Sequence, residues 1–336
     1  MRLLVTGGAG FIGSHFVRTA LAGGYPALAG ARITVLDKLT YAGRLANLPA
    51  DNPLLSVVVG DIADPETLRA VVPGSDAVVH FAAESHVDRS LSDPAAFVRT
   101  NVLGSQLLFD ACVAAEVGRV VHVSTDEVYG SIESGAWTES RPLQPNSPYS
   151  ASKAGGDLMA RAYWRTYGLD VRVTRSGNNY GPYQHPEKLI PNFVTRLLDG
   201  LPVPLYGDGS NVREWIHVDD HCHAIALVLA GGRPGEVYNV GGGAEATNRQ
   251  ITDELLRLCD ADPGLVRYVT DRKGHDFRYA VDGAKLRDEL GFHARTGFRP
   301  GLADTVRWYA ENRAWWQSPA PAGVGHPPAG VMGKSK

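Results

Sequence analysis

The stretch "VTGGAGFIG", residues 5–13, places Gly7, Gly10 and Gly13 between an apolar run and an amphipathic one. In a strand–turn–helix unit the first glycine permits a tight turn and the second lets backbone N–H groups approach a pyrophosphate. The third glycine allows the helix to pack closely on the strand. The N-terminus of the helix would face the phosphates with its partial positive charge. The stretch therefore predicts a dinucleotide-binding turn.

The second apolar run ends at Asp37, about 24 residues after Gly13, near the offset of the acid that binds the cofactor ribose. A carboxylate there repels a 2′-phosphate, which favours NAD over NADP, although the adjacent Lys38 leaves NADP open. Asp61 and Ile62 end the third run, where an adenine could lie.

Short β-branched runs alternate with longer mixed segments in the first half of the chain. "RLLVTG", "ITVLD", "LSVVVGD", "DAVVHFA" and "RVVHVST" are typical of buried parallel strands, and the segment 11–24 is typical of a helix that Gly23 and Gly24 would end. This βαβ series predicts an α/β fold, a Rossmann-type doubly wound parallel sheet with a smaller C-terminal α/β substrate-binding domain.

The pattern loosens after a further strand predicted near 169–175. Gly- and Pro-rich loops dominate, with helices near 186–199, 219–230 and 247–260. We expect an NAD-binding domain over 1–175, to which some later segments return, and a second domain mainly over 176–316, for which the resemblance described below implies nucleotide-sugar binding. Residues 317–336 have the composition of a disordered tail.

The chain has 336 residues, 44% of them hydrophobic, and a formal net charge of −3. Such a charge gives no global attraction to nucleic acid or membrane. No apolar run approaches about 18 residues, so no membrane span is expected, and the first residues resemble a strand rather than a signal peptide. Three widely spaced cysteines favour reduced thiols and a cytoplasmic location.

The segment "QPNSPYSASKAGGD", residues 144–157, predicts a helix with Ser147 as N-cap and Pro148 as its first residue. Tyr149 and Lys153 then lie at i and i+4 on one face. A tyrosine titrates at about 10 in water, so it needs nearby positive charge to act as a base. We expect the Lys153 ammonium and a cationic nicotinamide to favour the phenolate.

The glycine turn, Ser124 or Thr125, and the Tyr149–Lys153 pair together resemble the extended short-chain dehydrogenase/reductase family. The resemblance implies reversible hydride exchange at a sugar carbon. Thr125 would hydrogen-bond the reacting hydroxyl and Tyr149 would take its proton. Lys153 would hold the phenolate and the nicotinamide ribose.

Two adjacent acids, Asp126 and Glu127, follow the strand in "VSTDEVYG", residues 123–130. Once a hexose is oxidised at C-4, its C-5 hydrogen lies α to a ketone and becomes acidic. A carboxylate can remove it while a carboxylic acid protonates the C-6 hydroxyl, which leaves as water. Neighbouring carboxylates tend to titrate apart, one staying protonated. The pair indicates a dehydration, which a 4-epimerase or a reductase does not require.

Seven segments resemble the nucleotide-sugar 4,6-dehydratases within that family, over roughly residues 1–316. They are "VTGGAGFIGSH", "HFAAESHVDRS", "VSTDEVYG", "PYSASKAGGD", "NNYGPYQHPEKLIP", "LYGDGSNVREWIHVDDHC" and "DRKGHDFRYA". The resemblance implies that Asp126 is the acid at C-6 and Glu127 the base at C-5, with dTDP-glucose as substrate and NAD regenerated in each turnover. The chain departs from the family near Ser176, where a cysteine is expected.

The predicted site residues follow from the motifs and the resemblance together. The catalytic residues are Thr125, Asp126, Glu127, Tyr149 and Lys153. The cofactor-binding residues are Gly7, Gly10, Phe11, Ile12, Gly13, Asp37, Lys38, Leu39, Thr40, Asp61, Ile62, Phe81, Ala82, Ala83, Ser85, Thr100, Tyr149, Lys153 and Asn178. The substrate-binding residues are Ser85, Thr125, Asn179, Lys188, Leu189, Pro204, Tyr206, Arg213, Asn248, Arg272 and His275.

Alternatives remain open at this point. The alternative functions are the same reaction on a UDP- or GDP-hexose, a nucleotide-sugar 4-epimerase or decarboxylase, and an inactive NAD-sensing protein. "HVDDHCH", residues 217–223, invites a metal site, but Asp219 or Asp220 suits a helix N-cap and the proposed chemistry needs no metal, so we predict none. By resemblance we expect a homodimer that pairs helices near 94–116 and 149–167.

Overall fold

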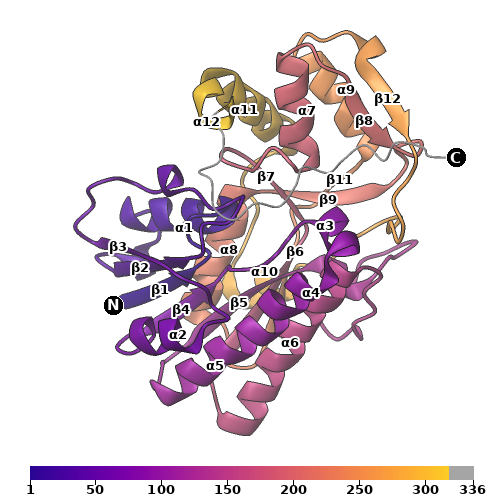
Figure 1. The fold of residues 1–336 in the computed structure, drawn as a ribbon. Coiled ribbons are helices and arrows are strands. Elements are labelled where there is room, and N and C mark those ends of the chain that lie inside the picture. Colours follow the sequence, from indigo (N-terminus) through magenta and orange to yellow (C-terminus); the bar gives the residue numbers. More distant parts are fainter. Residues whose placement is uncertain (318–336) are drawn as a thin grey trace, which may run out of the picture.

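A parallel sheet of seven strands forms the centre of the computed structural model, which describes residues 1–317 (Figure 1). The strands lie in the order β10-β6-β5-β4-β1-β2-β3. Their bounds are β1 Arg2–Thr6, β2 Arg32–Asp37, β3 Leu55–Val59, β4 Ala77–His80, β5 Val120–Thr125, β6 Val171–Ser176 and β10 Val237–Val240. The order reverses at β1 and β4, so the carboxyl ends of these strands flank the point where such sheets bind ligands.

Helices cover both faces of this sheet. One layer consists of α1 (Phe11–Leu21), α8 (Val218–Gly231) and α10 (Ala284–Leu290), and the other of α2 (Pro65–Val71), α5 (Ser105–Ala114) and α6 (Pro148–Tyr167). Successive strand residues point to opposite faces. Val5 therefore belongs to the core with α1 and α8, and Leu4 to the core with α2, α5 and α6. The doubly wound fold that the sequence predicts is confirmed.

Short helical segments connect these layers. α3 (Val87–Ser92) and α4 (Pro94–Phe97) follow β4, and a π-helical segment, Val98–Gly104, leads into α5. Tight 3₁₀ turns span Pro26–Leu28, Leu45–Asn47, Asp126–Tyr129 and Pro263–Leu265. α3 stands at the edge of the central cleft described below.

A second, smaller part lies beyond the carboxyl ends of the sheet (Figure 1). It contains a sheet of β11 (Ala244–Thr247), β9 (Val212–His217) and β7 (Asn178–Tyr180), and the pair β12 (Val266–Val269) and β8 (Val203–Tyr206). Its helices are α7 (Leu189–Leu198), α9 (Asn248–Leu258), α11 (Phe298–Glu311) and α12 (Arg313–Gln317). Phe193, Leu255, Leu302 and Tyr309 pack together in its core. The helices predicted near 186–199, 219–230 and 247–260 are confirmed.

Three local predictions are wrong. The loops predicted after residue 175 contain β7, β8 and β9, and β9 escaped recognition because it buries two charged residues, Arg213 and Glu214. β3 is an edge strand on which Val57 and Val59 are exposed, not a buried one. The N-cap of α8 is His217, whose ring nitrogen accepts from the backbone N–H of Asp219.

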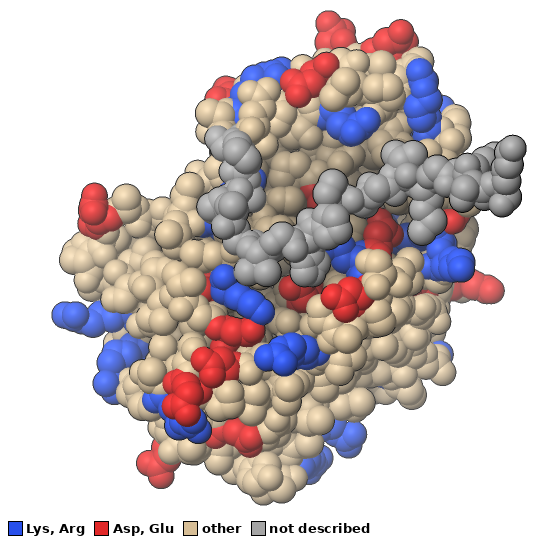
Figure 2. All heavy atoms as spheres, in the orientation of Figure 1, with Lys and Arg blue, Asp and Glu red and all other residues tan. Residues whose placement is uncertain are grey.

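Segments from the second half of the sequence return to the large sheet. β10 pairs with β6 in parallel, and α8 packs on β5 and β6. Of the predicted tail, Gln317 belongs to α12, and residues 318–336 lie outside the described residues. Figure 2 shows basic and acidic side chains intermixed over one face of the molecule.

Candidate active site

A cleft of about 520 Å³ lies between the carboxyl ends of the large sheet and the smaller part. Its walls include the carboxyl-terminal residues of β2, β5 and β6 and the residues that directly follow β1, β3 and β4, together with residues of β8, β9 and α9. The predicted catalytic residues and all predicted substrate-binding residues line this one cleft. Among the predicted cofactor contacts, only Leu39 is absent from the lining.

The glycine turn leaves backbone exposed where a phosphate would lie. Gly7 has a φ of +69°, and a Cβ on it would lie 2.5 Å from the backbone nitrogen of Ala82. A Cβ on Gly13 would collide with the carbonyl oxygen of Gly7. Gly10 caps α1 without a side-chain hydrogen bond, so the first N–H groups of the helix stay available. These features fit a dinucleotide pyrophosphate.

Asp37 is held at the end of β2 by two backbone donors. Its carboxylate accepts from the N–H of Ala9 at 2.9 Å and of Leu39 at 2.8 Å. Burial raises the pKa of Asp37, and the two hydrogen bonds act against that rise. Leu39, with a φ of 53°, thus orients the acid instead of lining the cleft. Lys38, the next residue, pairs with Asp61 at 2.7 Å, so a carboxylate offsets part of its charge.

The N-terminus of α6 fixes the tyrosine and the lysine. Ser147 and Ser150 form a reciprocal capping box, with each backbone N–H donating to the other hydroxyl at 3.1 Å, and Pro148 is the first helical residue. The predicted cap is therefore confirmed. Lys153, one turn after Tyr149, is buried, and its ammonium donates to the carbonyl oxygen of Val123 at 2.7 Å.

Burial shifts the pKa values of both members of this pair. Burial, followed by the nearby Glu127, raises the pKa of Tyr149, while a hydrogen bond with Thr125 acts against the rise. Without a bound cofactor, burial and this negative charge therefore favour the phenol form of Tyr149. Burial lowers the pKa of Lys153 to about 8, and Asp157 partly opposes this.

The two acids follow β5 on a 3₁₀ turn that Thr125 caps. The Thr125 hydroxyl accepts from the N–H of Glu127 at 3.3 Å and donates to Oδ1 of Asp126 at 3.2 Å. Asp126 is only 2% exposed, and its Oδ2 has no hydrogen-bond partner among the described residues. Burial, then Glu127 and Glu214, raises the pKa of Asp126 well above its ordinary value. This carboxyl is therefore suited to remain protonated.

Glu127 has more positive surroundings than Asp126. Burial raises its pKa, but the cations Arg272, Arg213 and Lys188 act in the opposite sense. The two neighbouring acids thus differ in environment, one beside another buried carboxylate and the other facing three cations. Such a difference separates a proton donor from a proton acceptor.

The three cations are held in different ways. Lys188 donates to the carbonyl oxygen of Ser85. Arg213 donates to the carbonyl oxygens of Val212 at 2.7 Å and of Asp276 at 2.9 Å. Arg272 lies beside Asp88. All three line the cleft around Glu127, which is the charge that a diphosphate requires.

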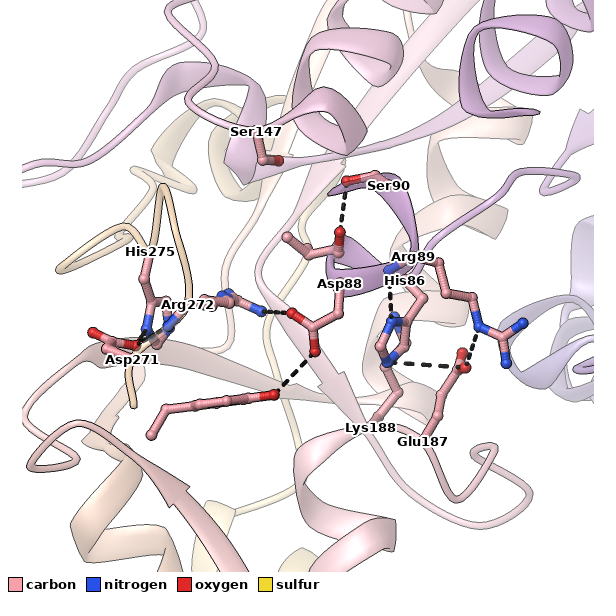
Figure 3. Close-up of polar contacts among 12 residues, drawn as sticks. His86, Asp88, Arg89, Ser90, Ser147, Glu187, Lys188, Asp271, Arg272 and His275 are labelled. Carbon is pink, nitrogen blue, oxygen red and sulfur yellow. Dashed lines mark hydrogen bonds and ion pairs between the residues drawn. The ribbon is translucent and has the colours of Figure 1, made fainter. Parts of the chain in front are cut away.

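Several lining residues were missed by sequence reasoning. They are His86, Asp88, Gln184, His185, Glu187 and Trp215, together with Glu84 and Asn192. Figure 3 shows His86 and Arg89 directed at Glu187, and Asp88 directed at Arg272. Except for Trp215 and Asn192, these residues lie in the two segments "HFAAESHVDRS" and "NNYGPYQHPEKLIP", so their proximity to Ser85 and Lys188 in the sequence was the signal that could have found them.

The histidine-rich segment at 217–223 uses its side chains separately. Asp219 pairs with His15 at 2.9 Å, His221 contacts the side-chain oxygen of Asn179 at 2.8 Å, and His223 contacts Arg295. Over residues 1–317 no group of three or more His, Cys, Asp or Glu residues is arranged to hold a metal ion.

The doubly wound sheet, the glycine turn and the Tyr149–Lys153 pair define an NAD-dependent enzyme of the extended short-chain dehydrogenase/reductase class. A sequence model described as GDP-mannose 4,6 dehydratase matches residues 4–305. The chain is 60% identical over 336 residues to a dTDP-glucose 4,6-dehydratase of Streptomyces antibioticus, covering 98% of this chain and 99% of the relative. The chain belongs to the dTDP-glucose 4,6-dehydratase family.

Solved structures agree with this assignment. A crystal structure of the dTDP-glucose 4,6-dehydratase DesIV from Streptomyces venezuelae, with NAD and TYD bound, has 66% identity and a TM-score of 0.93, covering 94% of this chain and 99% of that one. A UDP-glucose 4-epimerase of Thermus thermophilus in complex with NAD has 34% identity and a TM-score of 0.86, covering 93% and 100%. The fold is thus shared with epimerases, and the chemistry must be argued from the site.

Proposed function

We propose that this chain converts dTDP-glucose into dTDP-4-keto-6-deoxyglucose, as an NAD-dependent hydro-lyase. The observation that carries the proposal is the presence of Asp126 and Glu127 in one cleft with Tyr149, in unlike electrostatic environments. A hydride-transfer site needs the tyrosine, whereas loss of water needs an acid and a base as well.

Bound NAD supplies a reversible hydride acceptor, and its cationic nicotinamide favours the Tyr149 phenolate. Thr125 orients the C-4 hydroxyl of the hexose, and Tyr149 removes its proton as the C-4 carbon is oxidised to a ketone. Lys153 keeps positive charge next to the phenolate, and its hydrogen bond to Val123 fixes its position. Gly7, Gly10 and Gly13 hold the pyrophosphate, and Asp37 the adenosine ribose.

The acid pair performs the elimination. Glu127 removes the C-5 proton, which the C-4 ketone has made acidic, and the protonated Asp126 gives its proton to the departing C-6 hydroxyl. Water leaves, the hydride that NAD accepted from C-4 would return to C-6 of the 4-keto-5,6-ene, and C-5 would take up a proton. Lys188, Arg213 and Arg272 neutralise the diphosphate, while Pro204, Tyr206, Asn248 and His275 surround the nucleoside.

The proposed assembly is a homodimer. Val98, Leu103 and Leu158, on the π-helical segment and α6, are 54%, 43% and 56% exposed, and these helical elements pack side by side. Exposed apolar patches on adjacent helices mark association surfaces. We expect sedimentation at the dimer mass and a monomer when Leu158 and Val98 are both changed to Lys. A wild-type monomer would exclude the dimer.

The proposed location is the cytoplasm. The described helices include none that is long and apolar enough to cross a membrane, and Cys112, Cys222 and Cys259 are all free. Free thiols persist in a reducing compartment. Fractionation of the source cells tests this, and recovery in the membrane or secreted fraction would contradict it.

One assay tests the reaction and the substrate. The purified protein is incubated with dTDP-glucose, and the alkali-induced absorbance of a 4-keto sugar is followed. Formation of that absorbance with loss of one water by mass spectrometry supports the proposal. Product with UDP- or GDP-hexose alone would reject the dTDP assignment, and a C-4 epimer of unchanged mass would identify an epimerase.

A further inference from the structure

Asp88 on α3 bridges the cleft to two residues of the smaller part (Figure 3). Its Oδ2 accepts a hydrogen bond from the Tyr206 hydroxyl at 3.2 Å, and its Oδ1 lies 3.9 Å from Nη1 of Arg272. α3 follows β4 of the large sheet, whereas Tyr206 ends β8 and Arg272 follows β12. The carboxylate is therefore a negative charge set among residues of the proposed nucleotide site.

Asp88 also acts on the proposed diphosphate cations. Burial lowers the pKa of Lys188, and the charge of Asp88 acts against this fall together with those of Glu187 and Glu127, while Arg272 adds to it. Arg272 is 3.9 Å from the carboxylate, too far for a direct hydrogen bond, and its Nε has no partner among the described residues. The guanidinium is thus attracted to Asp88 without being saturated by it, and its donors stay available to a phosphate.

Arg213 provides the contrast. Its guanidinium donates to the backbone oxygens of Val212, Asp276 and Phe277 and stacks over the Tyr279 ring at 4.5 Å. Carbonyl groups orient this cation, and the carboxylates that act on its charge are Glu127 and Asp126 of the acid pair. At Arg272 and Lys188, by contrast, Asp88 is a further carboxylate that offsets part of the charge.

We propose that Asp88 is a specificity-determining residue that limits the negative charge the nucleotide site accepts. This rests on the proposed function, because the ligand is a nucleoside diphosphate. The diphosphate of a nucleotide sugar is esterified at both ends and carries two charges. Free dTDP has a terminal phosphate with a second pKa of about 6 and carries nearly one more negative charge at neutral pH. A fixed carboxylate beside the cations repels the extra charge and favours substrate over free nucleotide.

The expected size of this effect follows from Coulomb's law. A unit charge about 6 Å from the phosphates, at an effective dielectric constant between about 40 and 80, changes affinity about three- to tenfold for each ligand charge. Selection between ligands that differ by one charge therefore changes by about the same factor. Salt weakens it, because Asp88 is partly exposed.

The test uses the full-length NAD-loaded enzyme at pH 7.5 and low salt. It measures kcat and KM for dTDP-glucose and the competitive inhibition constant Ki of dTDP. In Asp88→Asn the amide oxygen still accepts from Tyr206 while the charge is lost. We expect Ki to fall more than KM, so that the ratio Ki/KM drops about three- to tenfold, and raised salt to diminish the change. Asp88→Glu keeps the charge, and its ratio should stay close to that of wild type.

Asp288→Asn is the matched control, because Asp288 is an exposed residue on α10 beside Arg287 and does not line the cleft. It alters the net charge equally and should leave Ki/KM unchanged. An Asp88→Asn ratio equal to that of wild type, a parallel rise of Ki and KM, or the same change in Asp288→Asn would overturn the inference. Wild-type enzyme that neither turns over dTDP-glucose nor binds dTDP would instead reject the proposed function itself, before any variant is compared.

Discussion

The ammonium of Lys153 donates a 2.7 Å hydrogen bond to the carbonyl oxygen of Val123, two residues before Thr125 on β5. This contact ties the helix that carries the proposed base to the strand that carries the substrate-orienting hydroxyl and the acid pair. The redox and elimination groups therefore share one rigid support. A displacement of α6 would disturb both halves of the proposed reaction.

The first prediction concerns the charge of Lys153. Burial lowers its pKa to about 8, so the ammonium loses its proton as pH rises through that value. We expect kcat/KM to fall on the alkaline side with an apparent pKa near 8. Lys153→Arg keeps a cation at all these pH values, so its residual activity should lose this alkaline limb. A limb that persists unchanged in the arginine variant would assign it to another group.

The second prediction separates oxidation from elimination. Glu127→Gln should still reduce bound NAD on addition of dTDP-glucose, because Tyr149 and Thr125 are intact. It should not exchange the C-5 hydrogen with solvent deuterium, and turnover should fall about 10²- to 10⁴-fold. The matched control is Glu133→Gln, an exposed residue of the loop after β5, which should behave as wild type. Undiminished deuterium exchange in Glu127→Gln would exclude Glu127 as the base.

The third prediction relates activity to stability at Asp126. The pKa of Asp126 in the folded protein lies well above its ordinary value. At any pH between the ordinary pKa and the raised pKa, the folded state therefore binds more protons than the unfolded state. The free energy of unfolding therefore falls as pH rises through that window. Asp126→Asn removes this dependence. We expect the variant to melt at a higher temperature than wild type at pH 7, and the difference between the two melting temperatures to narrow towards pH 4. Turnover should fall about 10²- to 10⁴-fold.

Calorimetry at the two pH values measures this gap. A variant that melts below wild type at pH 7 would contradict the buried proton on Asp126. The direction matters because a stabilised but inactive enzyme is the signature of a strained functional group.

The fourth prediction tests the close approach of the Gly7 backbone to that of Ala82 at the glycine turn. Gly7→Ala places a methyl group 2.5 Å from the backbone nitrogen of Ala82 at a φ of +69°. Gly168→Ala is a matched control, with a φ of +70° and open space around the added atom. We expect Gly168→Ala to cost about 1 kcal/mol of unfolding free energy and to retain NAD. Gly7→Ala should cost more and lose NAD binding, measured by the absorbance of the bound dinucleotide. Equal behaviour of the two variants would refute the close approach.

Much of the fold could be predicted from the sequence, because the local hydrophobic patterns agree with the positions of the elements in the folded sheet. The strands from β1 to β5 are largely apolar runs, and the Ser147–Pro148 cap of α6 is a local signal. β9 was not readable, since the burial of Glu214 depends on the N–H groups of Gly243 and Val281, which are distant in sequence. A buried acid looks like a surface residue until those donors are known.

The site residues also fall into those that the sequence could predict and those that it could not. Residues within motifs, such as Tyr149 and Glu127, could be named from the sequence, and they share one cleft. Asp88 could not, because Tyr206 is 118 positions away. The burial of Tyr149 and the nearness of Glu127, which both raise the pKa of its hydroxyl, could not be predicted from the sequence, because they are properties of the folded chain. The residue roles and the division at 175 stay predictions.

The return of β10 to the outer side of β6 constrains how this protein could be recombined with its relatives. Suppose that a chimera takes residues 1–176 from one parent and the rest from a relative with another nucleotide preference. Its α8 and β10 would then come from the relative, although they pack on the large sheet of the first parent. Their mismatch would expose an apolar edge prone to pairing between chains. A functional chimera needs at least two further junctions, one before α8 and one after β10.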